Sequence, residues 1–132
     1  VLDVIRGYLI LAIKLKNPRT HGEAFNFGPK NDQNKNVWEL VKEIKKNWKN
    51  VRWKVEINLK LKNKESKLLK LNSNKAKKYL NWSTVLNFKE SVKFTTNWYI
   101  DYKKKGKNFT RPISENNIIR YNNLLKLKKI KG

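Results

Sequence analysis

The sequence of 132 residues contains no cysteine and no methionine, and it has one histidine, three prolines and five glycines. The absence of cysteine excludes disulfides, thiolate nucleophiles and cysteine-based metal sites, a composition that suits the cytoplasm. The single histidine, His21, follows Pro18 in an expected turn, and we interpret it as a solvated residue because a metal site needs further ligands. Methionine is missing even at position 1, which favours a processed product or a piece of a longer reading frame.

Acidic residues are also scarce: 10 Asp and Glu stand against 32 Lys and Arg, so the net charge is +22. Such a charge attracts polyanions, and nucleic acid is the first class of partner to consider. However, only 5 of the cations are Arg, the lysines spread along the whole chain, and 19 Asn accompany them. Because Lys and Asn codons are both rich in A and T, the composition favours codon bias, with only non-specific nucleic-acid binding. A small lysine-rich nucleic-acid-binding protein is the alternative hypothesis.

Long hydrophobic runs and familiar catalytic motifs are missing as well. The longest apolar run, residues 8–13, is too short to cross a bilayer, so no membrane partner is expected. The sequence has no glycine-rich dinucleotide or phosphate loop and no nucleophile elbow. Tyr99 and Lys103 fit the pattern Tyr-x-x-x-Lys, but we interpret this match as chance because lysine is so frequent.

The pattern of apolar residues predicts three extended segments after a first helix. Residues 1–17 form a helix that is apolar on most sides, which is typical of a helix buried between layers. EAFNF (23–27) is a short, continuous apolar strand of the kind found in parallel sheets, and Gly28-Pro29 ends it. VRWKVEI (51–57) alternates like a half-buried strand, and LLKL (68–71) is a short extended piece.

Four further helices are predicted from periodicity and capping residues. Asn36 caps a helix over 37–48, and Asn72 or Ser73 caps a short one over 74–80 that a left-handed Asn81 closes. Asn87 and Glu90 form a capping box for a helix that Gly106 ends, and Ser114 caps the last helix. The tryptophans lie on the apolar sides of these elements, which predicts that they belong to the core. We expect burial above all for three of them: Trp38, Trp53 and Trp98.

Several strings of the sequence resemble one family when they are taken in order. VLDVIRGYLILAIKL, EAFNFGP, WELVKEIKKNW, KESKLLKLNSNKAKKYLNW and FKESVKFTTNWY follow one another as they do in CDP-glucose 4,6-dehydratases, and the tail NFTRPISENNIIRY is similar to the end of those enzymes. These dehydratases belong to the extended short-chain dehydrogenase/reductase family. The resemblance covers nearly all of the chain.

The resemblance implies an α/β fold class: the C-terminal portion of a Rossmann-type enzyme with its small substrate-binding lobe, mostly helical with a few short strands. Residues 1–30 would be the last Rossmann helix and strand, and residues 31–132 the lobe and the C-terminal helices. The family uses NAD to convert the sugar of a nucleotide-sugar substrate to its 4-keto-6-deoxy form. The NAD-binding and catalytic motifs would lie before Val1, so this chain alone is expected to bind no NAD and to catalyse nothing. The full-length enzyme could be a homodimer, and the sugar and base stay open.

One substrate segment of the family corresponds to residues of this chain. The resemblance implies that Lys62, Lys64 and Glu65 take part in substrate binding, with Lys62 as the positive charge that meets the diphosphate. Asn63 and Lys64 stand where the family has proline and histidine, and Asn81 stands where it has glycine. A solvated loop of lysines explains 62–65 equally well.

Overall fold

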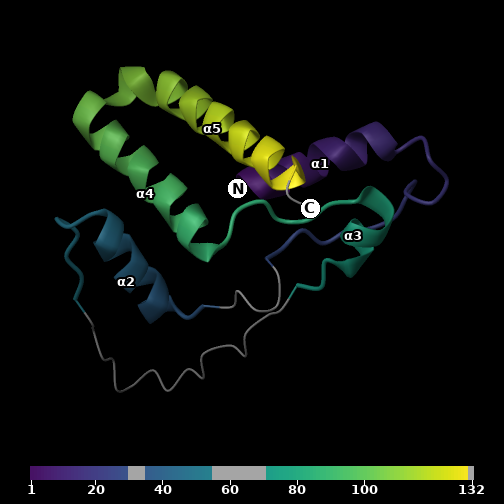
Figure 1. Cartoon of the computed structure of the whole chain (residues 1–132), viewed down its shortest axis with the longest axis horizontal. Coiled ribbons are helices and arrows are strands. Elements are labelled where there is room, and N and C mark those ends of the chain that lie inside the picture. Colours follow the sequence, from purple (N-terminus) through teal and green to yellow (C-terminus); the bar gives the residue numbers. More distant parts are fainter. Residues whose placement is uncertain (30–34, 55–70, 131–132) are drawn as a thin grey trace.

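The chain is built from helices in the part that the structure describes. The computed structural model describes residues 1–29, 35–54 and 71–130. Its elements, in chain order, are α1 (Leu2–Lys14), α2 (Val37–Asn47), α3 (Asn74–Leu80), α4 (Phe88–Lys105), the short 3-10 helix η2 (Lys107–Phe109) and α5 (Thr110–Ile130). In Figure 1, α4 and α5 run antiparallel and are joined through η2, while α2 packs against α4 and α1 against α3.

Local capping explains where the middle helices begin and end. Asn36 and Asn87 each accept the backbone N–H of the glutamate three residues later, and Glu39 and Glu90 each accept the N–H of the cap in return. These reciprocal bonds satisfy amide groups that a helix end leaves unpaired. Asn81 has the left-handed φ of 51° after α3, and Gly106 ends α4. The predicted starts of α2 and α4, and the end of α3, are therefore confirmed.

The two outer helices differ from the prediction. α1 ends at Lys14, before Asn17-Pro18, because Thr20 lies under its last turn and its hydroxyl donates to the Lys14 carbonyl. α5 begins at Thr110 rather than after Ser114. Pro112 lies in its first turn, where a missing backbone N–H costs nothing. Ser114 is therefore not a cap, and its Oγ donates to the Thr110 carbonyl 2.8 Å away.

The core has two clusters on either side of the segment between α3 and α4. Phe27, Ala76, Leu80 and Trp82 form the first, which joins α1 to α3. Val85, Leu86, Phe94 and Tyr121 form the second, which joins α4 to α5. Residues from the start, the middle and the end of the chain thus meet in the interior, where Leu2 of α1 and Leu124 and Leu125 of α5 pack on the second cluster.

The predicted α/β fold class is wrong for the described residues, none of which lies in a strand. Residues 23–27 are irregular and pair with no other described segment, and their backbone runs between α1 and α3. Phe27 is buried there against α1, and the next amide, Gly28 N–H, bonds to a side chain rather than to a strand. Residues 51–54 and Leu71 are also irregular. The rest of the predicted segments 51–57 and 68–71 lies outside the described residues.

The apolar character of α1 does not bury it on all sides, which corrects another expectation. The helix packs on the core with one face only, as Val4, Ile10 and Leu11 contact the first cluster. Ile5, Leu9 and Ile13 on its other sides stay exposed, and Tyr8 is also exposed although its ring meets Phe27. The described helices include none that is both long and apolar enough to cross a bilayer.

The predicted burial of the tryptophans holds only in part. Trp38 is 48% exposed and Trp53 42% exposed, so both expectations are wrong. Trp98 is half-buried on α4, with its Nε1 donating to Ser114 Oγ at 3.0 Å. Trp82, by contrast, is only 2% exposed. None of the residues of α2 is buried, and Trp38 shares this with the rest of its helix.

Candidate functional site

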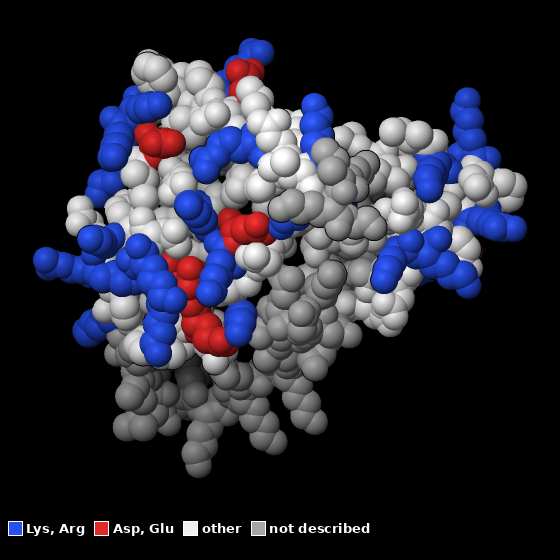
Figure 2. Space-filling view, viewed as in Figure 1, with Lys and Arg blue, Asp and Glu red and all other residues white. Residues whose placement is uncertain are grey.

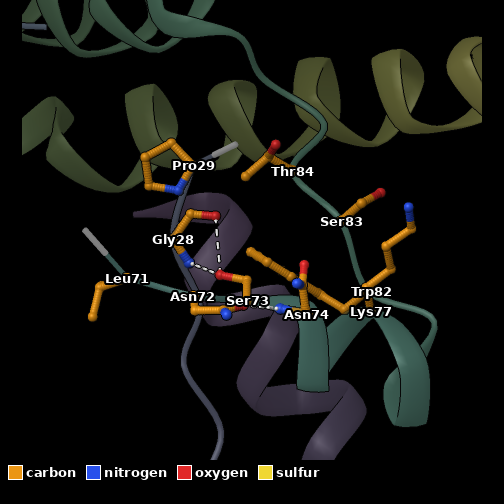
Figure 3. A pocket seen from close by; sticks show the side chains of 10 residues that line it. All are labelled: Gly28, Pro29, Leu71, Asn72, Ser73, Asn74, Lys77, Trp82, Ser83 and Thr84. Atoms are coloured by element: carbon orange, nitrogen blue, oxygen red, sulfur yellow. Dashed lines mark hydrogen bonds between the residues drawn. The ribbon is translucent and has the colours of Figure 1, made fainter. Parts of the chain in front are cut away.

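A pocket lies where the residues after Phe27 meet the start of α3 and the segment that follows it. Its volume is about 410 Å³, within the range of small-molecule sites. Its walls consist of ten residues, drawn in Figure 3: Gly28, Pro29, Leu71, Asn72, Ser73, Asn74, Lys77, Trp82, Ser83 and Thr84. A second cavity of about 300 Å³ adjoins it, lined mainly by apolar residues, and shares Gly28, Pro29 and Trp82 with it.

A side-chain to backbone contact holds the two halves of this pocket together. Gly28 N–H donates to Ser73 Oγ at 2.9 Å, and the Ser73 hydroxyl donates in return to the Gly28 carbonyl at 3.4 Å (Figure 3). A Cβ at position 28 would lie 3.0 Å from Leu71 Cβ, so glycine permits this close approach. Asn72 Oδ1 accepts the Asn74 N–H at 2.9 Å, a turn that shapes the chain before α3.

Several polar groups of the pocket are available to a ligand. Lys77, Ser83 and Thr84 line it, and their side chains make no hydrogen bond or ion pair within the described part of the chain. The same holds for the side-chain amide of Asn74, whose backbone N–H alone is bonded. The pocket therefore offers one ammonium group, two hydroxyls and one amide, a set that suits a polar anionic ligand.

The back wall of the pocket is fixed by a polar network centred on Asp3. Its carboxylate accepts the N–H of Val85 at 2.8 Å, the N–H of Leu86 at 3.1 Å and the hydroxyl of Tyr121 at 2.6 Å. Its backbone carbonyl accepts Trp82 Nε1–H at 3.0 Å. Asp3 thereby sets the course of the chain from Trp82 to Leu86, next to Ser83 and Thr84.

Arg6 completes this network from the next turn of α1. Its Nε donates to the Tyr121 hydroxyl at 3.0 Å, and its Nη2 donates to the Ser83 carbonyl. Burial raises the pKa of Tyr121, and the hydrogen bond and negative charge of Asp3 raise it further, against the opposing effect of Arg6. Tyr121 is therefore held as a neutral donor, which makes this network a structural clamp.

Neither His21 nor the Tyr99–Lys103 pair lines this pocket. Lys62, Lys64 and Glu65 lie outside the described residues. His21 is exposed in the turn after Pro18, and the described residues contain no group of three metal-ligating side chains. Tyr99 is 53% exposed on α4, and Lys103 Nζ lies 5.8 Å from the Trp48 ring centroid, an arrangement that serves packing.

Sequence reasoning missed Ser73, Lys77 and Thr84 as pocket residues and Asp3 as their support. Gly28-Pro29 and the Asn-Ser-Asn run at 72–74 can be recognised in the sequence as turn residues. However, Gly28 and Ser73 are 45 positions apart, and no local pattern indicates that they are in contact.

Comparison with known proteins gave no relative: no family model, no curated protein and no solved structure matches the chain.

Proposed function

We propose that the chain is the C-terminal, substrate-binding segment of a sugar-nucleotide 4,6-dehydratase similar to the CDP-glucose enzymes, and that it is inactive without an NAD-binding part. The proposal rests on the family-like strings and on one observation about them. EAFNFGP and the described part of KESKLLKLNSNKAKKYLNW, residues 71–82, are far apart in sequence, yet they meet at the Gly28–Ser73 contact and line one pocket together. Both segments are similar to segments of the dehydratases, and because they line the same cavity we interpret this cavity as the ligand site.

The chemistry of the pocket suits a nucleotide sugar. Lys77 supplies a compact positive charge for a diphosphate oxygen, without the fork of a guanidinium. The hydroxyls of Ser83 and Thr84 and the amide of Asn74 can donate to and accept from sugar hydroxyls. Ser73 has a different task, since its Oγ is already engaged with Gly28 and holds the pocket wall. These residues bind and orient a substrate, and the proposal gives them no part in proton or hydride transfer.

The residues of this chain do not fit an NAD site. The glycines with positive φ, Gly22 and Gly106, each lie alone in a turn, and the sequence has no Gly-x-Gly-x-x-Gly run to bring a helix close to a pyrophosphate. NAD binding and the redox steps therefore belong to a separate part. The proposal also includes cytoplasmic location, where nucleotide sugars and NAD are both at hand.

The test is calorimetric titration of the chain with CDP-glucose at about 150 mM salt, where long-range attraction of anions is screened. We expect Lys77→Ala to weaken binding about tenfold, because it removes a hydrogen bond to a charged group. Lys104→Ala is the matched control, since this exposed lysine of α4 has no partner among the described residues. Equal weakening by the two substitutions would show general polycation binding and reject the site.

A second arm tests the reaction class. The chain is co-expressed with the NAD-binding part of a CDP-glucose 4,6-dehydratase, and formation of the 4-keto-6-deoxy product from CDP-glucose is measured. We expect product only from the mixture, and less of it with Lys77→Ala. A properly associated mixture that forms no product would contradict the proposed enzyme class.

A further inference from the structure

Two exposed tryptophans form a pair on the surface beside α2. The ring centroids of Trp38 and Trp53 are 5.8 Å apart and the rings are inclined by 79°. Both side chains are more than two-fifths exposed. Indole is the largest side chain and usually gains its stability from burial, so an exposed pair in contact is typical of a binding surface rather than of packing.

The pair is held in place by the turn that follows α2. Lys45 Nζ donates to the Lys49 carbonyl at 2.5 Å and to the Val51 carbonyl at 2.9 Å. Val51 N–H donates in turn to the Trp48 carbonyl at 3.1 Å. These bonds bring the chain back toward α2 and place Trp53 against Trp38. The aromatic surface is therefore pre-organised and loses little conformational freedom when a ligand binds.

The charge around the pair is positive. Lys42 Nζ lies 5.0 Å from the Trp38 ring centroid, one helical turn away. The two carboxylates of α2 are engaged with other lysines: Glu39 with Lys35 at 2.8 Å and Glu43 with Lys46 at 3.0 Å. Figure 2 shows Lys and Arg side chains over much of the face, with Asp and Glu among them on the side where α2 lies in Figure 1. The surface thus combines stacking area with a field that attracts anions.

We propose that the Trp38–Trp53 surface binds single-stranded nucleic acid. Unpaired bases stack on the exposed indoles, and Lys42 meets a neighbouring phosphate, the combination by which single strands are bound without sequence preference. A duplex is a poor ligand for this surface because its bases are already stacked on one another. Exposed indoles also stack on sugar rings, but an uncharged sugar gains nothing from a chain with a net charge of +22.

The test is titration of a fluorescein-labelled oligothymidylate of about 12 nucleotides, a length within the range that one single-strand site covers. Trp38→Ala and Trp53→Ala are each expected to lower the affinity about tenfold, the loss typical of one stacked base. Phe109→Ala is the matched control, since Phe109 is an equally exposed aromatic residue (49%) on η2, away from α2, and its loss should leave the affinity unchanged. Trp38→Phe keeps a stacking ring and should retain most of the binding, which separates stacking from any loss of folding.

Salt dependence separates the contribution of Lys42 from that of the indoles. Lys42→Ala is expected to reduce the slope of log K against log salt by about 0.7, the value for one phosphate contact on a single strand. The tryptophan variants should leave this slope unchanged. Three results would overturn the proposal: tryptophan variants that bind like Phe109→Ala, a duplex of the same length that binds as tightly, or tryptophan-dependent binding of maltohexaose in place of the oligonucleotide. None of these measurements depends on Lys77 or on CDP-glucose, so the two proposals fail separately.

Discussion

The ring of Phe27 occupies the space that a side chain at position 7 would need. A Cβ built on Gly7 would lie 2.5 Å from Phe27 Cδ1 and 2.6 Å from its Cε1. Gly7 is buried in the middle of α1, and Phe27 contacts Tyr8 and Trp82 edge to face, with centroids 5.5 Å and 5.0 Å away. The glycine therefore sets the distance between α1 and the core.

Gly7→Ala is expected to destabilise the chain, although alanine normally favours a helix by about 0.5–1 kcal/mol over glycine. Overpacking against a ring that cannot move away costs about 1–3 kcal/mol, so the net effect has the opposite sign. Urea unfolding followed by circular dichroism measures it. In a Phe27→Leu background the cost should shrink, and an unchanged cost would show that the clash with Phe27 is not its source.

Tyr121→Phe should destabilise the chain by about 1–3 kcal/mol at neutral pH, because it leaves the Asp3 carboxylate and the Arg6 donor without this partner. The difference should also depend on pH. The pKa of Tyr121 is raised in the folded chain above its unfolded value of about 10. Its contribution is therefore fully present below about pH 10 and is lost as the pH rises through the folded pKa. Parallel unfolding of the two proteins from pH 7 to 11 measures this, and a constant difference would contradict it.

Glu90→Gln should destabilise the chain at neutral pH by about 0.5–1 kcal/mol. Glu90 joins the start of α4 to α5, since Lys128 Nζ lies 2.8 Å from its Oε2. Burial raises the pKa of Glu90, but hydrogen bonds from Lys128 and from the Asn87 N–H together hold it below its usual value. The stabilisation is therefore present above about pH 4.3 and lost as the pH falls through the folded pKa.

The matched control for Glu90 is Glu115→Gln, which breaks the exposed i,i+4 pair with Arg111 on α5. Thermal unfolding at pH 7 and at pH 3 should show a difference from the wild type for Glu90→Gln only at the higher pH. Equal effects of the two substitutions would mean that the contact between α4 and α5 adds nothing beyond a surface ion pair.

Lys45→Met should separate the two indoles without removing either. The substitution keeps the length of the side chain but removes the donor that Lys49 and Val51 share. We expect the exciton signal of the coupled Trp38 and Trp53 rings in circular dichroism to fall as far as in Trp38→Phe. Lys46→Met is the control on the same helix, because among the described residues the only ion-pair partner of Lys46 is Glu43. An unchanged signal in Lys45→Met would show that the turn does not position Trp53.

The sequence predicted the helices well because their determinants are local. The capping pairs Asn36–Glu39 and Asn87–Glu90 lie three residues apart, and Asn81 ends α3 through its own φ. A strand is not determined locally in this way, because its backbone needs hydrogen bonds from a neighbouring strand that can be far away in the sequence. EAFNF has the composition of a buried strand, yet its two phenylalanines pack in a helical core and the amide that follows it, Gly28 N–H, bonds to Ser73.

The burial of the tryptophans and the position of the pocket depend on contacts between distant residues, which the periodicity of the sequence does not predict. Trp38 lies on the apolar stripe of α2, but α2 buries none of its residues, so the stripe alone gives the wrong environment. The pocket joins Gly28 to Ser73, and its support joins Asp3 to residues more than 80 positions away. No spacing rule links such residues, and the resemblance directed attention to 62–65 instead.

The bond between Asp3 and Tyr121 spans 118 positions, nearly the whole chain. The amides of Val85 and Leu86 can bond to Asp3 without α5. The clamp is complete only when α5 brings the Tyr121 hydroxyl to the same carboxylate. Because it joins residues 118 positions apart, closing this clamp costs more chain entropy than a local contact does. Until α5 docks, Val85, Leu86 and Phe94 of the second core cluster lack the cover that Tyr121 gives them, and this apolar surface is open to other chains.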